Sequence, residues 1–365
     1  MKKILFVAPF PPPIHGASLR NQSVADSELI NRQFVLKTFA ANQANDVNDI
    51  GVFSWRKILK TIKDTVALIQ VLYSFRPDLV YFNISLFGFA LYRDTVYTTI
   101  FKLNRTKLLY HLRTQGVQDQ VTRSFLKKTL FKYLFHNVDV ICLSHRLSTD
   151  IAGIYQHQPY IVGNGIPVES TLNVSGQKNS RIPTVLFLSN LNKKKGIDDL
   201  LQAFGKLKEK EIPYKGIIVG RPFDYTEADI NQKCAEIGIQ EEVQVVGPLY
   251  GEKKIDVFLS SDIFVLPTYF EAFPGVILEA MQFGLPVVST QEGAIPEMVQ
   301  HTVTGLLVEK QNVPQLVGAI EQLLYDQSAR EKMGILGRKR FYAEYTQDIA
   351  ENNLVEVFNQ VLDDH

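Results

Sequence analysis

The chain has 365 residues, of which 45% are hydrophobic and 21% charged, and its formal net charge is +1. This length suits two domains, and the composition is that of an ordinary globular protein rather than a disordered or membrane-spanning one. Its two cysteines, Cys142 and Cys234, stand far apart, which excludes a disulfide framework and a thiolate metal site and predicts a reducing cytosol.

The near-neutral net charge is the sum of two halves of opposite charge. The first 165 residues hold 20 lysines and arginines against 10 aspartates and glutamates, whereas the remaining 200 hold 19 against 28. Opposite charges suggest different partners for the two halves. The basic half contains no nucleic-acid-binding module, so we expect no nucleic acid among the partners.

The first ten residues, MKKILFVAPF, superficially resemble a signal peptide. Their apolar stretch is too short and runs into Pro11, Pro12 and Pro13 without a small-residue cleavage site, so a first buried strand is the better interpretation. No apolar run approaches the length that spans a bilayer. We therefore expect a cytoplasmic protein, with peripheral association at the inner face of the membrane as an option.

Short apolar runs alternate with longer helical patterns along the first half. Helical spacing is found at Phe53–Phe75 and Val121–His136. Alternating strands and helices predict a parallel sheet covered on both faces. The expected strands are Ile4–Ala8, Phe34–Lys37, Leu79–Phe82, Lys107–Tyr110, Val138–Leu143 and Tyr160–Val162.

The same rhythm restarts after a polar segment, Glu169–Arg181, and ends with an amphipathic helical stretch, Phe341–Leu362. Two such runs predict an α/β protein with two doubly wound domains, residues 1–168 and 169–344. Ligands of such domains bind beyond the carboxyl ends of the strands, so we expect the site in a cleft between the domains. The expected strands are Thr184–Leu188, Gly216–Val219, Val243–Val246, Ile263–Leu266, Pro286–Ser289 and Leu306–Val308.

The most informative stretch is EAFPGVILE, which begins at Glu271 and ends at Glu279. The run Asp262–Pro267 predicts a buried strand before it, and Val276–Phe283 has helical spacing. Glu271 is therefore expected on a loop at the carboxyl end of a strand, and Glu279 about one turn inside the next helix. Amides at that helix start would attract a phosphate, and two carboxylates could bind sugar and ribose hydroxyls. This combination suits a nucleotide-sugar.

Three further segments surround this stretch in a recognisable order. FLSNLNKKKGIDDLLQAF precedes it from Phe187, and EAMQFGLPVVST, EGAIPE and TGLLVE follow it from Glu279, Glu292 and Thr304. Together with the glutamate pair they resemble the retaining, GT-B-fold glycosyltransferases of family 4, with their E-x7-E motif, over about residues 182–325. The resemblance implies the GT-B architecture, in which two Rossmann-like domains face a central cleft. It also implies that the last helix, about residues 345–365, packs back on the N-terminal domain.

The resemblance assigns roles in donor binding. It implies that Lys195 holds the donor diphosphate, that Glu279 binds the ribose hydroxyls and that Glu271 contacts the donor sugar. It further implies that the backbone of four consecutive residues (Phe273, Pro274, Gly275, Val276) meets the phosphate and the sugar. The family usually has an arginine five positions before that lysine, where this chain has Asn190. Diphosphate binding is then expected to depend more on Lys195 and on the helix start.

Candidates in the N-terminal half rest on a weaker match. In PPPIHGAS, Gly16 occupies the family's small-residue loop near the donor phosphate, and His15 is either a substrate contact or a solvated loop histidine. His111 follows the strand Lys107–Tyr110, where the family places a histidine close to the transferred sugar. The alternative is a structural histidine that caps its strand. Arg113 is a candidate contact to the acceptor or to a phosphate.

The resemblance implies a metal-independent hexosyltransferase that moves a hexose or N-acetylhexosamine, most simply from a UDP-sugar, to a glycan or lipid-linked acceptor in cell-surface polysaccharide biosynthesis. No cluster of residues has metal-ligand spacing, and no GxGxxG follows the first strand, which argues against a dehydrogenase. Two alternatives stay open. One is a nucleotide-sugar 2-epimerase, and the other is a non-catalytic nucleotide-sugar-binding subunit, which only Asn190 favours.

The segment Val121–Phe135 suggests a membrane contact. Helical spacing places Leu126, Leu130 and Tyr133 on one face, suited to the core. The opposite side then carries basic residues with two aromatic ones among them, as interfacial helices do, and would bind an anionic membrane surface. A solvated helix whose aromatics contact a neighbouring element is the alternative. The residues of that side are Arg123, Lys127, Lys128, Phe131, Lys132 and Phe135.

Overall fold

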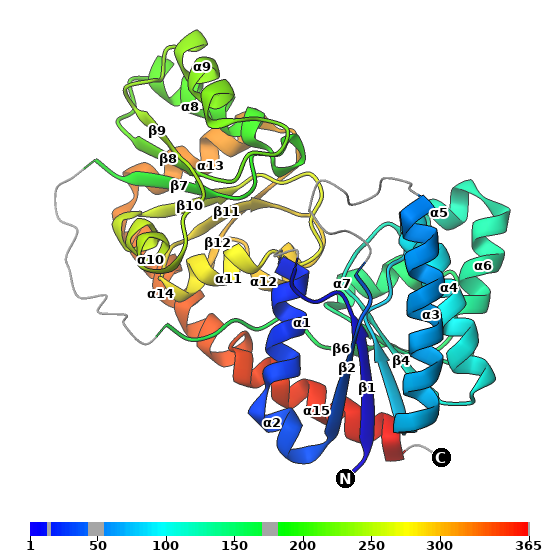
Figure 1. The fold of residues 1–365 in the computed structure, drawn as a ribbon. Helices are drawn as coiled ribbons and strands as arrows, with labels where there is room; N and C mark the ends of the chain where they lie inside the picture. Colours follow the sequence, from blue (N-terminus) through cyan, green and yellow to red (C-terminus); the bar gives the residue numbers. More distant parts are fainter. Residues whose placement is uncertain (13–15, 43–54, 170–181, 364–365) are drawn as a thin grey trace. The chain divides into compact units, whose positions relative to one another are not determined.

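The structure is a computed structural model that describes residues 1–12, 16–42, 55–169 and 182–363. Contacts divide the chain into two compact units, Met1–Asn164 together with Asp348–His365, and Gly165–Gln347. Each unit contains a six-stranded parallel sheet with helices around it (Figure 1). The α/β fold class with two doubly wound sheets is thus confirmed.

The strands of the N-terminal unit pair in the order β2-β1-β3-β4-β5-β6, all parallel. The central strands β1 and β3 are apolar on both faces because helices cover both sides of the sheet. The strand bounds are β1 Lys3–Ala8, β2 Val35–Ala40, β3 Leu79–Phe82, β4 Lys107–Leu112, β5 Asp139–Cys142 and β6 Tyr160–Ile161.

Two apolar clusters lie on the two faces of this sheet. One contains side chains of α3, α4 and α6, and the other contains side chains of α2 and α15, which lie on the opposite face in Figure 1. The helices of this unit are α1 Gly16–Asp26, α2 Glu28–Gln33, α3 Trp55–Phe75, α4 Gly88–Leu103, α5 Val117–Arg123, α6 Phe125–Phe135, α7 His145–Ser148 and α15 Gln347–Asp363, with a 3₁₀ turn at Thr149–Ile151.

The last helix, α15, belongs to the N-terminal unit although it is the end of the chain. The Phe358 ring lies 5.0 Å from that of Tyr81 on β3 and 5.6 Å from that of Phe34, and it is fully buried. The sequence predicted one helix over Phe341–Leu362, which is wrong. The chain leaves the helix at Tyr345, whose carbonyl accepts a hydrogen bond from the Ile166 amide (3.0 Å).

The strands of the C-terminal unit pair in the order β12-β11-β10-β7-β8-β9, again all parallel. They are β7 Thr184–Leu188, β8 Lys215–Val219, β9 Val243–Val246, β10 Ile263–Leu266, β11 Val287–Thr290 and β12 Gly305–Val308. The helices are α8 Ile197–Glu209, α9 Glu227–Glu236, α10 Gly251–Ser260, α11 Gly275–Gln282, α12 Ile295–Met298, α13 Val313–Tyr325 and α14 Gln327–Glu344, with a 3₁₀ turn at Lys193–Lys195.

The predicted faces of the segment Val121–Phe135 are also wrong, except at Leu130, which packs against the core as expected. The chain breaks at Ser124, whose hydroxyl accepts the Lys127 amide and starts α6 anew. The restart turns Phe131 and Phe135 into the core and leaves Leu126 80% exposed. The two aromatic rings expected at the surface therefore pack under the helix. None of the described helices combines the length and the apolar character that crossing a membrane requires.

Candidate functional site

The strand order of the C-terminal unit reverses between β7 and β10. From β7 the chain continues to β8 and β9 on one side, whereas β10, β11 and β12 follow on the other. In open α/β sheets this switch point leaves a crevice beyond the carboxyl ends of the two strands. The loop after β7 carries Lys195 and the loop after β10 carries Glu271, so the topology brings these two predicted residues to one place.

Hydrogen bonds join these two loops. The Lys194 carbonyl accepts the Tyr269 amide (2.7 Å) and the Thr268 hydroxyl (3.1 Å). Gly196, in the loop after β7, has φ +75°, and a Cβ there would lie 1.9 Å from the Pro267 carbonyl oxygen in the loop after β10. Only glycine fits such a close approach in a left-handed conformation. The glycine after Lys195 is therefore needed for the contact between the loops.

The Lys195 ammonium forms an ion pair with the Glu271 carboxylate, and both side chains are about one-fifth exposed. The two neighbouring lysines point elsewhere, since Lys194 stands over the Phe270 ring and Lys193 over the Tyr225 ring. A third loop packs against the same region, because the Ala294 amide donates to the Ala272 carbonyl (2.8 Å). The glutamate loop is thus held from two sides.

Helix α11 begins at Gly275, directly after this loop, rather than at Val276 as predicted. Pro274 precedes it and provides no side-chain cap for the first turn. The first amides of a helix lack partners within the helix and carry its positive dipole end, so they can bind an anion. The Phe273 side chain is buried and lies 6.2 Å from the Tyr345 ring, so this residue contributes packing in addition to its backbone.

Glu279 lies one turn into α11 and pairs with a lysine that the sequence did not single out. Lys254 Nζ, from α10, is 2.7 Å from Glu279 Oε2. The side chains are 30% and 23% exposed. A periodicity argument could not find this pair, because its members are on separate helices.

Asn190 lies exposed just after β7. Its carbonyl accepts the Asn192 amide (2.7 Å), which helps to shape the turn that leads to Lys195. The structure thus places all donor-binding candidates of the C-terminal half on the loops after β7 and β10 or on α11.

The N-terminal unit has a comparable switch point between β1 and β3. Gly16, the first residue of α1, follows the loop after β1. Asn21 of this helix binds both neighbouring segments, since it donates to the Pro9 carbonyl (2.8 Å) and accepts from Asn83 after β3. His15 lies outside the described residues.

His111 lies inside β4 rather than at its end, because the strand continues to Leu112. Its side chain is 3% exposed, its Nδ1 is 2.6 Å from the Tyr81 hydroxyl, and its buried Nε2 has no hydrogen-bond partner among the described residues. Burial, and secondarily the charge of Arg113, lower the pKa of His111 well below 6.5. The ring is therefore neutral at pH 7. Tyr81 is a partner that the sequence analysis missed.

Arg113 directly follows β4 and donates from Nη1 to the Asn164 side chain (2.6 Å). It also influences Tyr81, whose pKa is raised by burial although the Arg113 guanidinium acts in the opposite direction. His111, Tyr81 and Arg113 thus form one polar group at the carboxyl-end half of β3 and β4.

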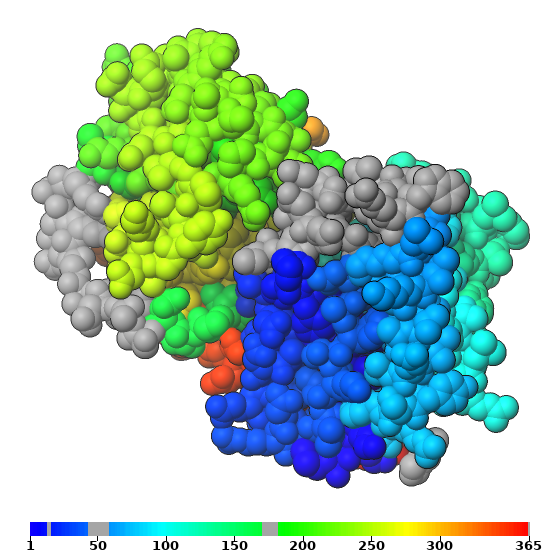
Figure 2. Space-filling model, viewed as in Figure 1, coloured from blue at the N-terminus to red at the C-terminus, as the bar shows by residue number. Residues whose placement is uncertain are grey.

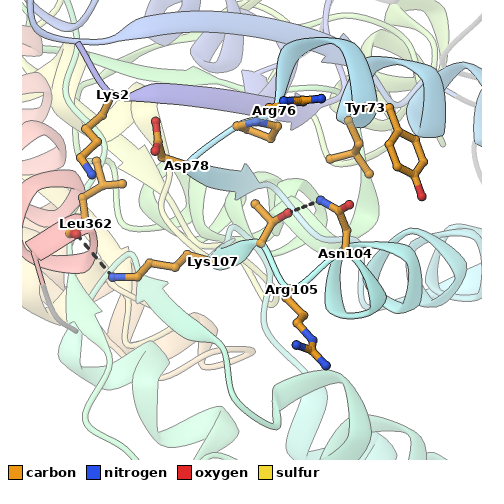
Figure 3. Close-up of a pocket in the computed structure, with 11 residues that line it drawn as sticks. Lys2, Tyr73, Arg76, Asp78, Asn104, Arg105, Lys107 and Leu362 are labelled. Atoms are coloured by element: carbon orange, nitrogen blue, oxygen red, sulfur yellow. Dashed lines mark hydrogen bonds between the residues drawn. The ribbon is translucent and has the colours of Figure 1, made fainter.

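A cavity of about 560 Å³ lies at the opposite, amino-terminal edge of the N-terminal sheet (Figure 3). Its basic residues are Lys2, Arg76, Arg105 and Lys107. Lys107 Nζ donates to the Val361 carbonyl (2.8 Å) at the end of α15. The cavity also adjoins the ends of α3 and α4, and helix carboxyl ends are negative. We therefore interpret these cations as helix-end partners rather than as an anion site.

Among the residues that the structure describes, no group of three or more His, Cys, Asp or Glu side chains is arranged to hold a metal ion. The cations near the site are lysines, which suit phosphate groups as mobile point charges.

Comparison with known proteins matches residues 169–340 to the family model described as "Glycosyl transferases group 1". The chain is 27% identical over 240 residues to "Uncharacterized glycosyltransferase MJ1607" of Methanocaldococcus jannaschii, covering 61% of this chain and 60% of that protein. It is 28% identical over 176 residues to "Capsular polysaccharide biosynthesis glycosyltransferase CapM" of Staphylococcus aureus, covering 48% and 46%. The chain thus spans only about half to three-fifths of the length of these curated relatives.

The fold as a whole matches solved GT-B structures. Anabaena Alr3699/HepE, solved in complex with UDP, superposes with a TM-score of 0.77 at 18% identity, covering 99% of this chain and 100% of that one. At this identity the match shows the fold alone. It confirms the GT-B architecture that the sequence resemblance implied.

Proposed function

Because residues 169–340 match the family model of the glycosyl transferases group 1, we propose that the chain transfers a sugar from a nucleoside diphosphate to an acceptor. The finer proposal is a hexose or N-acetylhexosamine donated by UDP, with retention of anomeric configuration and without a metal ion. The acceptor we propose is a glycan or lipid-linked glycan in cell-surface polysaccharide biosynthesis. The name of CapM supports the polysaccharide context, and the UDP complex of HepE supports UDP as the nucleotide.

One observation carries the proposal. The loops after β7 and β10 are hydrogen-bonded to each other, so Lys195 and Glu271 meet beside the start of α11. A diphosphate at this place would be bound by an ammonium and by helix amides, while Glu279 would accept hydrogen bonds from the ribose. Glu271 would be left for the hydroxyls of the donor sugar.

Loss of the diphosphate is the step that this arrangement would assist. We propose that the acceptor hydroxyl attacks from the face that the diphosphate leaves, and that a phosphate oxygen takes the hydroxyl proton. The bond from the anomeric carbon to the phosphate oxygen breaks while the bond to the acceptor oxygen forms. Stabilising the charge on the departing diphosphate is then the main catalytic task, and Lys195 and the α11 amides would perform it. The diphosphate would share Lys195 with Glu271.

We propose that the N-terminal unit binds the acceptor. In addition, Gly16 would allow close approach of the backbone to the donor phosphate, and His111 would donate a hydrogen bond from its unpaired Nε2 to an oxygen of the transferred sugar. For that, Nδ1 must accept the hydrogen bond of the Tyr81 hydroxyl, which leaves the proton on Nε2. Arg113 would contact the acceptor or a phosphate.

The residues now proposed to contact a membrane lie at the start of α6, not around Phe131 and Phe135. Phe125 and Leu126 are each 80% exposed at its start, and Arg123, Lys128 and Lys132 are exposed nearby. Apolar side chains beside basic ones suit an anionic membrane surface. Helix α3 of the same unit, which lies at the surface in Figure 2, also has exposed apolar side chains, such as Leu59, Ile62 and Val66. We propose peripheral binding at the cytoplasmic face, where a lipid-linked acceptor would be found.

Thermal shift with a panel of nucleoside diphosphates and their sugars tests the donor proposal, because a ligand that binds the folded state raises its stability. We expect UDP and a UDP-sugar to raise the melting temperature. Lys195→Ala and Glu279→Ala should weaken this binding by about 10-fold or more, as loss of a charge-assisted hydrogen bond does. Lys194→Ala, whose side chain stands over the Phe270 ring, is the matched control.

Glu271→Ala should mainly lower the rate of transfer, and the anomeric configuration of the product, read by NMR, tests retention. Unchanged transfer by both Glu271→Ala and Glu279→Ala would show that the site is wrongly assigned. Epimerised sugar formed without an acceptor would instead support the 2-epimerase. UDP-sugar binding without transfer to any acceptor would support the non-catalytic subunit.

A further inference from the structure

Glu279 has a buried oxygen atom with an unusual environment. Its Oε2 is buried and accepts no hydrogen bond from the described residues, so its partner is a charge alone. The ammonium of Lys254 lies 2.7 Å from this oxygen and is the charge that compensates it. A carboxylate oxygen removed from water needs such a partner, because burial of an unpaired charge is costly.

The position of Lys254 in its own helix does not explain its presence. It is the fourth residue of α10, which begins at Gly251. A cation there faces the positive end of the helix dipole, which is unfavourable. Since the helix itself disfavours a lysine at this point, the compensating contact is the ion pair with Glu279, on another helix 25 positions further along the chain.

We propose that Lys254 is a positioning residue for ribose recognition. It holds Oε2 of Glu279 against α10, so that Oε1 is directed to the ribose hydroxyls of the nucleoside diphosphate. This inference rests on the proposed function, since it requires Glu279 to bind ribose. Fixing the glutamate in advance removes the loss of side-chain freedom that binding would otherwise require.

The proposal separates a lysine that acts through Glu279 from a lysine that binds the ligand itself. A lysine that acts through Glu279 matters only when the ligand has ribose hydroxyls. A lysine that contacts the diphosphate matters equally with or without those hydroxyls. Analogues that lack the 2′ and 3′ hydroxyls therefore distinguish the two roles, and a purely structural role would not depend on the ribose at all.

The experiment measures the dissociation constants of UDP and 2′,3′-dideoxy-UDP by calorimetry, with GDP and its dideoxy analogue used if GDP is what the wild type binds. We expect Lys254→Met to weaken UDP binding about tenfold, the scale of one charge-assisted interaction. The dideoxy analogue should bind the wild type and Lys254→Met equally. Lys254→Arg should restore most of the UDP affinity, and Lys253→Met, at an exposed neighbouring position, should behave as the wild type.

Equal losses for both nucleotides, or no loss for UDP, would overturn the inference. Glu279→Gln is measured in parallel to separate the failures. If Glu279→Gln loses UDP affinity in a ribose-dependent way and Lys254→Met does not, the proposed function stands and only the role of Lys254 is wrong. If the wild type binds no nucleoside diphosphate, the proposed function fails and this inference fails with it. Circular dichroism and the melting temperature of each variant check that it is folded.

Discussion

His111 shows how one residue can be predicted by type and place but not by environment. A histidine at the end of a strand predicted either a contact close to the transferred sugar or a structural histidine that caps its strand. Instead it lies within β4, bonded to Tyr81 and buried. Burial disfavours the imidazolium, which is why its pKa falls. The environment depends on residues of β3, 30 positions earlier, which no local pattern around His111 contains.

This environment predicts how stability depends on pH. The pKa of His111 is lower in the folded than in the unfolded chain, so stability is full above the unfolded value near 6.5 and is lost as the pH falls below it. The loss is about 1.4 kcal/mol for each pH unit while His111 stays neutral. We expect the free energy of unfolding to fall less steeply between pH 7 and 5 in His111→Gln than in the wild type. Denaturant unfolding of both proteins at the two pH values measures this, and equal slopes would contradict it.

Asn190 is the residue at which the chain departs from the pattern of the family that it resembles. It is exposed beside the turn that carries Lys195. An arginine there would add a fixed cation near the proposed diphosphate site. We therefore expect Asn190→Arg to tighten UDP binding several-fold, about 1 kcal/mol or more for a charged hydrogen bond. Calorimetry measures this, with Asn190→Gln as the uncharged control. Unchanged or weaker affinity would mean that the loop has been rebuilt around asparagine.

At the scale of elements, strands were the most predictable part. A short apolar run that is buried on both faces, such as β1 or β10, has few alternatives in a parallel sheet. Helix breaks were the least predictable. The helices break at Ser124 and Tyr345, where the spacing of apolar residues still predicts a helix. The first break depends on the Ser124 cap and the second on a backbone hydrogen bond with Ile166. Each break changes the direction in which the following side chains point.

The same reasoning explains which site residues the sequence could indicate. Glu271 and Glu279 stand in one short motif, and the loop with Lys195 is recognisable by its glycine. Lys254 and Tyr81 carry no motif, because each matters through a partner on another element. Sequence patterns therefore predict residues that are defined locally, whereas the residues that hold them in place require the fold.

The restart of α6 leads to a prediction on membrane binding. Phe125 and Leu126 are exposed beside Arg123 and Lys128, so we expect the protein to float with vesicles that contain anionic lipid and to dissociate with salt. Each basic residue near such a surface adds about 1 kcal/mol. The double variants Phe125→Ser with Leu126→Ser, and Lys128→Glu with Lys132→Glu, should each reduce flotation.

Phe131→Leu is the matched control, since this ring is buried and was wrongly expected at the surface. Equal recovery with neutral vesicles, or no flotation with either kind of vesicle, would contradict binding to an anionic membrane. A soluble acceptor would then be the better choice.

At the scale of the whole molecule, the division into units does not follow chain order. The end of the chain, α15, completes the core of the N-terminal unit, where Leu354, Phe358 and Val361 are buried. The amphipathic pattern of this segment predicts that it is buried, but not against which sheet. Burial on the N-terminal sheet brings residues from the two ends of the chain into one apolar cluster.

This arrangement predicts that a substitution near the end of the chain destabilises the beginning. Phe358→Ala removes a fully buried ring that contacts Phe34 and Tyr81, and such a loss costs about 3–5 kcal/mol. We expect faster hydrogen exchange in β1, β3 and α2, with exchange in the C-terminal sheet unchanged. The affinity for UDP should change little, because Lys195, Glu279 and the start of α11, which are proposed to bind the diphosphate and the ribose, lie in the C-terminal unit. Asn359→Ala, at the exposed neighbouring position, is the control. Faster exchange in β7 or β10 would show that the stability of the C-terminal sheet depends on Phe358. A loss of UDP affinity of about tenfold or more would show that donor binding depends on the N-terminal unit.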